Sequence, residues 1–350
     1  MSTVAIDITN VCNFDCIHCL RDKMESRVNI SVDLFKKIID QIAELGIERV
    51  SLTGGEPTLH PNFGELLTYL AEKEVEFNFV TNGWEFKERV LPIFLDRAVK
   101  RYLQSICFSI DGASDKTHDV LRGKGSFREV IKAANLCRLK GIPISIKTVV
   151  TNINKNEVME IALLGVSLKA TKHHFIALTP TPRAIDEGII PSSSEMKEIF
   201  SFITGTLMPA MKTQINIEGA WGLSPPVVNC NAYLQIYNID HIGNFLFCCN
   251  LSHVRNGDKP YEIGREFLVD LNKESLEKGI AEHYQVLAQF TRDRLKDALG
   301  GYSLTRFPCW WCLQYFDKVD WLKNYTDSEF YQLVKEKQNG QYVGNQRIVK

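Results

Sequence analysis

Three cysteines lie close together near the start of the chain, in the run Cys12-Asn-Phe-Asp-Cys16-Ile-His-Cys19. Thiolates are soft ligands that select iron–sulfur clusters, zinc or copper(I). Three of them on one short loop can hold three irons of a cubane cluster and leave the fourth iron open for chemistry. The alternative is a structural zinc site with His18 or a distant residue as the fourth ligand, although structural zinc sites want four closed ligands.

A second set of cysteines lies in the later part of the chain and comprises Cys230, Cys248, Cys249, Cys309 and Cys312. Clustered cysteines in a reducing compartment indicate metal ligation or redox chemistry rather than disulfides. A zinc site with four cysteine ligands fits this set physically, as does an iron–sulfur cluster. Cys107 and Cys137 stand alone in apolar surroundings, so we expect both to be small buried hydrophobic residues.

Strands and helices alternate through about the first two hundred residues. The strand candidates are 4–8, 49–53, 76–81, 103–110, 144–150 and 173–178, each followed by a helical pattern. This alternation predicts an α/β fold with parallel pairing and right-handed crossovers. Six such units suit a partial (β/α)6 barrel better than a complete eight-fold one, although a doubly wound sheet would show the same alternation.

The alternation stops near Lys212. We therefore predict a barrel domain over 1–212, a smaller cysteine-bearing domain over 213–320 and a helical tail over 321–350. In the smaller domain we expect short strands at 233–239 and 244–248 and a polar helix over 267–299. A last helix is expected from about 328 to 338.

Polar and glycine-containing turns follow the second, third and fourth strand candidates. They are Leu52-Thr-Gly54-Gly55-Glu56-Pro57, Thr81-Asn82-Gly83 and Ser109-Ile-Asp111-Gly112. In a parallel barrel these turns share one face with the first cysteine loop, the face on which barrel enzymes hold their active sites. Glycines expose backbone groups there, and a carboxylate such as Glu56 can receive an ammonium group.

The CxxxCxxC spacing of Cys12, Cys16 and Cys19, together with Gly54-Gly55-Glu56-Pro57, resembles the radical S-adenosylmethionine (SAM) superfamily over about residues 3 to 185. The resemblance implies a 4Fe–4S cluster on the three cysteines and SAM as cofactor. The GGEP segment would bind the methionine amino group. Polar contacts to the ribose and the methionine carboxylate would come from Asn82, Ser109, Asp111 and Arg122.

The chemistry that the resemblance implies is reductive cleavage of SAM. A 5′-deoxyadenosyl radical then takes a hydrogen atom from a substrate, while the protein supplies placement and exclusion of water. A reductant such as flavodoxin or ferredoxin would be the electron-donating partner. No catalytic acid or base stands out in the sequence.

The spacing of Cys230, Gly243 and Cys248 resembles the opening of the SPASM and twitch auxiliary-cluster domains. No cysteine follows Cys312, so the resemblance is to the shorter twitch form with one auxiliary 4Fe–4S cluster. Its four ligands would be Cys230, Cys248, Cys309 and Cys312, with Cys249 as a replacement for Cys248. Trp310 and Trp311 would shield this cluster from water.

Arg183 lies in the run Thr179-Pro-Thr-Pro-Arg183-Ala184, which follows the sixth strand candidate. The run resembles a loop of SPASM-type enzymes that ends Gly-Arg-Ala. Arg183 could there hold a substrate carboxylate or the cofactor, whereas an exposed loop arginine is otherwise only solvated.

The overall charge is balanced, with 41 basic and 42 acidic side chains and a formal net charge of −1. Such a balance gives no electrostatic footprint for nucleic acid. No apolar run reaches eighteen residues and the N-terminus lacks signal-peptide features, so we expect a cytoplasmic protein without membrane contact.

Three functions fit these features. The first is an oxidoreductase that dehydrogenates a small metabolite such as a sugar or aminocyclitol. The second is an enzyme that crosslinks or epimerises a peptide during its maturation. The third, a non-catalytic metal-binding protein, leaves the GGEP segment and the barrel pattern unexplained.

Overall fold

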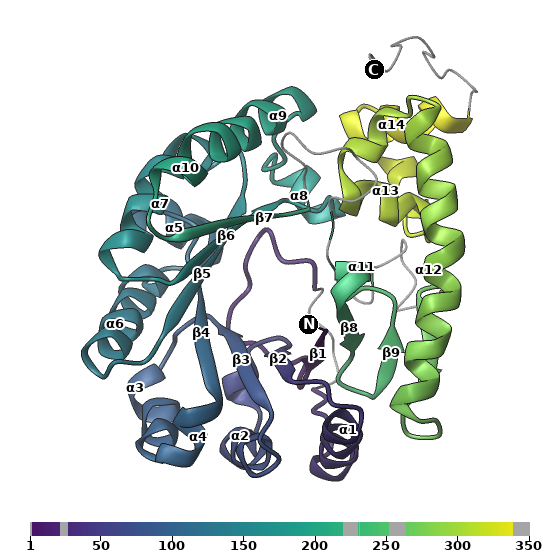
Figure 1. The fold of residues 1–350 in the computed structure, drawn as a ribbon. Coiled ribbons are helices and arrows are strands. Elements are labelled where there is room, and N and C mark those ends of the chain that lie inside the picture. Colours follow the sequence, from purple (N-terminus) through teal and green to yellow (C-terminus); the bar gives the residue numbers. More distant parts are fainter. Residues whose placement is uncertain (1, 22–26, 220–229, 231, 252–263, 339–350) are drawn as a thin grey trace.

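The structure is a computed structural model that describes residues 2–21, 27–219, 230, 232–251 and 264–338. Its centre is a ten-stranded sheet in the order β10-β9-β8-β1-β2-β3-β4-β5-β6-β7. The strands curve into an open barrel, with the helices of the first two hundred residues on its outside (Figure 1). The predicted partial barrel is thus confirmed.

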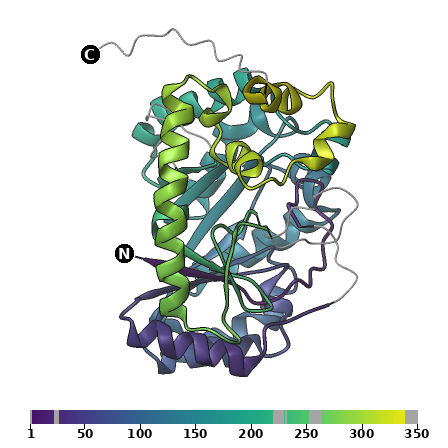
Figure 2. The same ribbon diagram turned by 90° about the vertical axis from the view of Figure 1, so that its right-hand side faces the viewer.

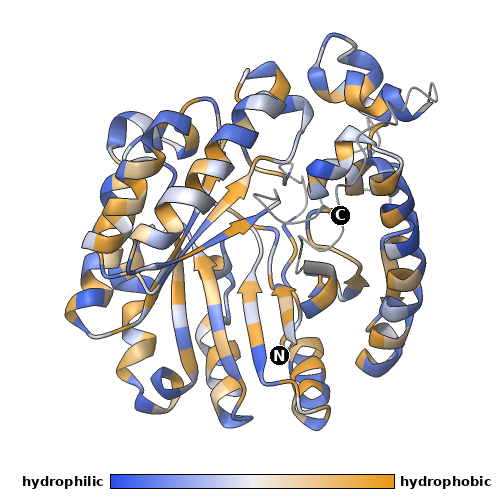
Figure 3. Cartoon of the chain, turned by 45° about the horizontal axis from the view of Figure 1, so that its top comes forward, coloured by the Kyte–Doolittle hydropathy of each residue, from blue (hydrophilic) through white to orange (hydrophobic). Residues whose placement is uncertain are grey.

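The parallel part of the barrel consists of β1 Thr3–Asp7, β2 Arg49–Thr53, β3 Glu76–Thr81, β4 Leu103–Ser109, β5 Ile144–Val150, β6 Lys172–Ala177 and β7 Gln214–Glu218. The helices that accompany these strands are α1 Val32–Glu44, α2 Phe63–Glu72, α3 Phe86–Arg89, α4 Arg97–Tyr102, α5 Asp115–Arg122, α6 Ser126–Leu139, α7 Val158–Ser167, α8 Pro182–Asp186, α9 Ser193–Phe202 and α10 Met208–Ala210. In Figure 3 apolar residues alternate with polar ones along several of these strands, as expected where two faces differ in environment.

One strand of the parallel part was missed from the sequence. β7 begins at Gln214, beyond the point where the alternation seemed to end, and it pairs in parallel with β6. Its five residues, Gln-Ile-Asn-Ile-Glu, include only one that is fully buried, Ile215. An edge strand of this kind carries a weak hydrophobic signal, which explains why the sequence alone did not reveal it.

The later segment adds β8 Ile236–Ile239, β9 Asn244–Leu246 and β10 Phe267–Asp270, and the helices α11 Ala232–Gln235, α12 Leu276–Leu299, α13 Pro308–Tyr315 and α14 Glu329–Gln338. The helix expected over 267–299 therefore begins later than predicted. Its first residues form β10, and Ser275 caps the helix by accepting a hydrogen bond from the backbone of Lys278.

The later segment continues the sheet of the barrel. β8 pairs in parallel with β1, so that Thr3 lies opposite Ile236. Tyr237, Phe245 and Leu276 belong to the same apolar core as the first strands. The long helix α12 runs alongside the strands (Figure 2). Among the described residues, no helix has both the length and the apolar character needed to cross a membrane.

Candidate functional site

The first cysteine loop follows β1 at the carboxyl end of the strand. Cys12, Cys16 and Cys19 are free thiols. Negative charge on Cys12 or Cys19 raises the pKa of Cys16. Burial raises the pKa of the Cys16 thiol to about 12. A bound cation must therefore stabilise the thiolate form, as iron does when thiolates ligate it.

The two glycines after β2 pack directly on this loop. The backbone N–H of Gly55 donates to the carbonyl of Thr9 at 2.7 Å, and that of Glu56 donates to the carbonyl of Val11 at 2.7 Å. A Cβ atom on Gly55 would overlap the carbonyl oxygen of Val11. The close approach explains why glycine is required here, and it positions the residues that lead into Cys12.

Glu56 is buried and its carboxylate is already used within the protein. It accepts hydrogen bonds from the hydroxyls of Thr58 and Thr81 at 2.7 and 2.8 Å, and from the backbone N–H of Asn82 at 2.7 Å. We expected this carboxylate to receive an ammonium group. In the structure it joins the turns after β2 and β3, and its contact with the methionine amino group stays a prediction. A cofactor contact of the surrounding turn, Gly54 to Pro57, stays a prediction.

Asn82 and Ser109 lie at the carboxyl ends of neighbouring strands, as predicted. The side-chain amide of Asn82 donates to the side chain of Asn13, within the cysteine loop, at 2.8 Å. Ser109 is the last residue of β4 and is buried. Both side chains thus lie on the face that carries the first cysteine loop, and their contacts with SAM stay predictions.

Asp111 and Arg122 form a buried ion pair. Asp111 also accepts a hydrogen bond from the backbone N–H of Val149 at 2.7 Å and lies 3.3 Å from the Nε2 atom of His18. Burial opposes ionisation of this carboxyl, but Arg122 and His18 outweigh it, so its pKa is lowered. The Nη1 atom of Arg122 lies 3.9 Å from the Sγ atom of Cys16. Both residues therefore contact the cysteine loop, and their predicted contact with SAM stays untested.

Arg183 also contacts this loop. Its guanidinium donates to the carboxylate of Asp15 at 2.8 Å and remains two-fifths exposed. The contact connects the turn after β6 to the residues between Cys12 and Cys16.

The second set of cysteines gathers at one place in the fold. Cys230, Cys248, Cys309 and Cys312 are half-buried and pack against the same apolar cluster. The charge of Cys230 acts on Cys248, Cys309 and Cys312. Trp310 and Trp311 are buried, and the indole N–H of Trp310 donates to the carbonyl of Leu178 at 3.0 Å, which joins α13 to the barrel.

The surroundings of these thiols fit an iron–sulfur cluster. The side-chain amide of Asn250 lies 3.6 Å from the Sγ atom of Cys309. A Cβ atom on Gly219 would lie only 3.2 Å from the same sulfur, so glycine keeps space open beside it. Four thiols with such a neighbour suit a soft, fully ligated cluster. Among the described residues, no group of three His, Cys, Asp or Glu side chains is arranged to hold a metal ion. The ligand assignment therefore rests on the thiol donors and on their proximity.

A charged cluster that the sequence did not reveal lies on the inner face of the sheet. The ring of His173 and the side chain of Ile146 face α7, because both lie near a Cβ atom placed on Gly165. Lys147 and His174, one residue further along each strand, therefore point inward. The Nζ atom of Lys147 lies 3.4 Å from one oxygen of Glu218, and the Nδ1 atom of His174 lies 2.8 Å from the other.

This inner-face cluster of Lys147, His174 and Glu218 adjoins the predicted SAM contact Ser109 and the second cysteine group. Lys147 lies opposite Ser109 in the register of β4 and β5, and its charge acts on Cys249. Cys107, expected only as a small buried hydrophobic residue, is buried on the same polar face, where the charge of Lys147 acts on it. Side chains alternate between the two faces of a strand, and this alternation in β5 would have predicted that Lys147 lies on the other face from Ile146.

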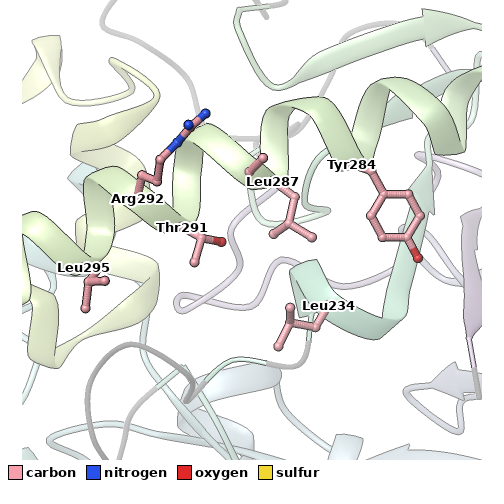
Figure 4. Close-up of a pocket in the computed structure, with 7 residues that line it drawn as sticks. Leu234, Tyr284, Leu287, Thr291, Arg292 and Leu295 are labelled. Carbon is pink, nitrogen blue, oxygen red and sulfur yellow. The ribbon is translucent and has the colours of Figure 1, made fainter.

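A separate apolar pocket lies on the outer surface between α11 and α12 (Figure 4). Leu234, Tyr284 and Leu287 contribute to its lining. None of the predicted site residues lines it.

Comparison with known proteins agrees with this geometry. Residues 6–165 match the family described as Radical SAM superfamily. Mycofactocin maturase MftC of Mycobacterium ulcerans is 30% identical over 265 residues, 71% of this chain and 68% of that protein. AdoMet-dependent heme synthase of Methanosarcina barkeri is 30% identical over 200 residues, 56% of each protein.

A solved structure shows the same fold. The crystal structure of Streptococcus suis SuiB bound to precursor peptide SuiA matches with a TM-score of 0.63 at 17% identity, over 78% of this chain and 63% of that one. The chain spans between 50% and 62% of the length of several other curated relatives that it matches. The matched family, the relatives and the paired cysteine groups agree: the chain belongs to the radical SAM superfamily, in its SPASM-type subclass.

Proposed function

We propose that this protein is a radical SAM enzyme that modifies a peptide. The observation that carries the proposal is the inner-face cluster of Lys147, His174 and Glu218, in which Lys147 lies opposite the predicted SAM contact Ser109 and its charge acts on Cys249 of the second cysteine group. A substrate on this face would lie beside the predicted SAM contact Ser109. The relative named mycofactocin maturase and the SuiB structure with its precursor peptide support a peptide over the sugar or aminocyclitol that we expected first.

The residues of the first site have two roles: some position the cysteine loop, and others would ligate the cluster. SAM and a 4Fe–4S cluster supply the radical that abstracts a substrate hydrogen atom. Cys12, Cys16 and Cys19 would ligate that cluster. Gly55 and Glu56 hold the loop in place through their backbone N–H groups, which donate to Thr9 and Val11. Glu56 joins the turns that carry the predicted cofactor contacts.

We assign Cys230, Cys248, Cys309 and Cys312 to one auxiliary 4Fe–4S cluster. Their mutual proximity supports the assignment. Cys248 packs against the same apolar cluster as Cys230, Cys309 and Cys312, which favours Cys248 over Cys249 as the fourth ligand. A fully ligated cluster beside the substrate suits a net oxidation, such as an oxidative crosslink.

A second candidate is oxidation of a small molecule. The similarity to AdoMet-dependent heme synthase favours it. Lys147 and His174 would then bind an acidic group of that small molecule instead of a peptide.

The test uses the reconstituted full chain with SAM, dithionite and synthetic peptides encoded by short reading frames beside its gene. We expect one peptide to accelerate formation of 5′-deoxyadenosine and to lose two hydrogens by mass. Deuterium placed at the modified carbon should appear in 5′-deoxyadenosine. Acceleration by tetrapyrroles and by none of the peptides would contradict the peptide proposal and support the second candidate.

A further inference from the structure

A fully buried arginine lies next to the second set of cysteines. Arg294, on α12, has 0% of its surface exposed. Arginine keeps its positive charge at any pH in which proteins fold. Removing a guanidinium from water is strongly unfavourable unless the interior contains groups that the charge stabilises.

The guanidinium is fixed against α13. Its Nη2 atom donates to the carbonyl of Thr305 at 3.1 Å. Its central carbon lies 5.0 Å from the ring centroid of Trp311, which is itself fully buried. The indole N–H of Trp311 in turn donates to Asp297 at 2.9 Å. The positive charge is therefore held over the residue that precedes Cys312.

Cys312 directly follows Trp311 on α13 and packs against the apolar cluster that holds Trp311 and Phe290. A thiolate bound to iron keeps much of its negative charge, and each electron added to a cluster makes it more negative. A fixed cation nearby stabilises the reduced form more than the oxidised form, which raises the reduction potential.

We propose that Arg294 is a positioning residue whose buried charge raises the reduction potential of the auxiliary 4Fe–4S cluster. The inference rests on the proposed assignment of Cys230, Cys248, Cys309 and Cys312 as ligands. Burial alone disfavours the reduced, more negative state of the cluster. The charge of Arg294 offsets this effect and makes the auxiliary cluster of the proposed function a better electron acceptor.

The test is a redox titration of the reconstituted full chain, followed by electron paramagnetic resonance. Arg294→Met removes the charge and keeps an apolar side chain on Trp311. Arg294→Gln also removes the charge and keeps a donor for Thr305, which covers the case in which the methionine variant does not fold. Arg292→Met is the matched control, because Arg292 is an exposed arginine on the same helix (Figure 4).

We expect the neutral Arg294 variants to lower the reduction potential of the auxiliary cluster by at least about 59 mV. For one electron this is a tenfold change in the equilibrium constant of reduction. The potential of the first cluster, and both potentials of Arg292→Met, should stay unchanged. An unchanged auxiliary potential in a variant that holds both clusters would overturn the role of Arg294 alone. Iron content of about four rather than about eight atoms in the parent protein would instead overturn the ligand assignment, and the inference with it.

Discussion

At the scale of single residues, the first cysteine loop carries the chemistry. Cys16 is the middle cysteine of this loop, and it is buried beside Arg122. Burial raises the pKa of its thiol to about 12. Since we propose this residue as a ligand of the first cluster, we expect its removal to act on that cluster alone.

Replacing Cys16 by alanine should abolish formation of 5′-deoxyadenosine and remove about half of the bound iron. The reason is that Cys12 and Cys19 cannot hold a cubane by themselves. Iron analysis and chromatography of the SAM products measure both effects. Cys137→Ala is the control, because Cys137 lies in the apolar core and should not change either value. Undiminished SAM cleavage in Cys16→Ala would contradict the role of this loop.

Glu218 gives the inner-face cluster a dependence on pH. Removal from water opposes its ionisation, but Lys147 and His174 outweigh that and lower the pKa of Glu218 from 4.5 to about 2. Because the folded pKa is the lower one, the stabilisation is present above pH 4.5 and is lost as the pH falls towards 2. Solvent screening of this two-fifths exposed group limits the effect to about 1 kcal/mol.

Glu218→Gln should therefore lower the thermal unfolding midpoint at pH 7, and the difference from the parent protein should shrink between pH 5 and pH 2. Calorimetry or circular dichroism across this range measures the difference. A midpoint difference that stays constant with pH would show that Glu218 stabilises the fold through packing and not through its charge.

At the scale of elements, the turns after β2 and β3 hold the cysteine loop. Gly55 lies so close to Val11 that no side chain fits between them. Glu56 then connects this turn to Thr81 at the end of β3. The first cysteine loop is thus held by the turns after two neighbouring strands, through backbone contacts of Gly55 and Glu56.

Gly55→Ala should destabilise the fold by about 1–3 kcal/mol, because the turn or the cysteine loop must move to admit a methyl group. The shift should also lower the iron content of the first cluster. Denaturant unfolding and iron analysis measure the two effects. Gly205→Ala is the matched control, since a Cβ atom there meets nothing within 4 Å. Full iron loading of Gly55→Ala would show that the close contact does not position the ligands.

At the scale of the whole molecule, the later segment and the barrel share one sheet and one core. β8 pairs with β1. The side chain of Lys37 on α1 donates to the carbonyl of Leu271 at 2.8 Å, and Gln41 accepts from the backbone of Leu276 at 2.7 Å. These contacts join the segment that carries the second cysteines to the strand that leads into the first. The domain boundary predicted at residue 212 stays a prediction.

Phe245→Ala should therefore weaken both parts of the molecule. Phe245 is fully buried in the core that also holds Val4, and its removal should cost about 3–5 kcal/mol. We expect faster hydrogen exchange of β1 amides as well as of β9, measured by mass spectrometry. Leu299→Ala, at a site 66% exposed, serves as the control. Protection of β1 that is unaffected by Phe245→Ala would mean that the two parts unfold independently.

The sequence by itself determined the features that depend on local spacing. The spacing of Cys12, Cys16 and Cys19 places three thiols on one loop, and Gly54-Gly55-Glu56-Pro57 marks a turn that admits close backbone contact. The alternation of strands and helices determined the parallel barrel, because each unit must bury one apolar face. The strands predicted at 49–53, 76–81 and 144–150 have the same bounds as β2, β3 and β5.

Only the tertiary structure decided which polar groups satisfy one another. Asp111 and Arg122 form an ion pair, Glu56 accepts bonds from two separate turns, and Lys147, His174 and Glu218 meet across three strands. Arg294 stacks on Trp311, the residue before Cys312, from a helix that the sequence shows only as polar. The physical reason is that hydrogen bonds and charge pairs act over a few ångströms, while these partners are separated by many residues of chain and come together only when the sheet closes.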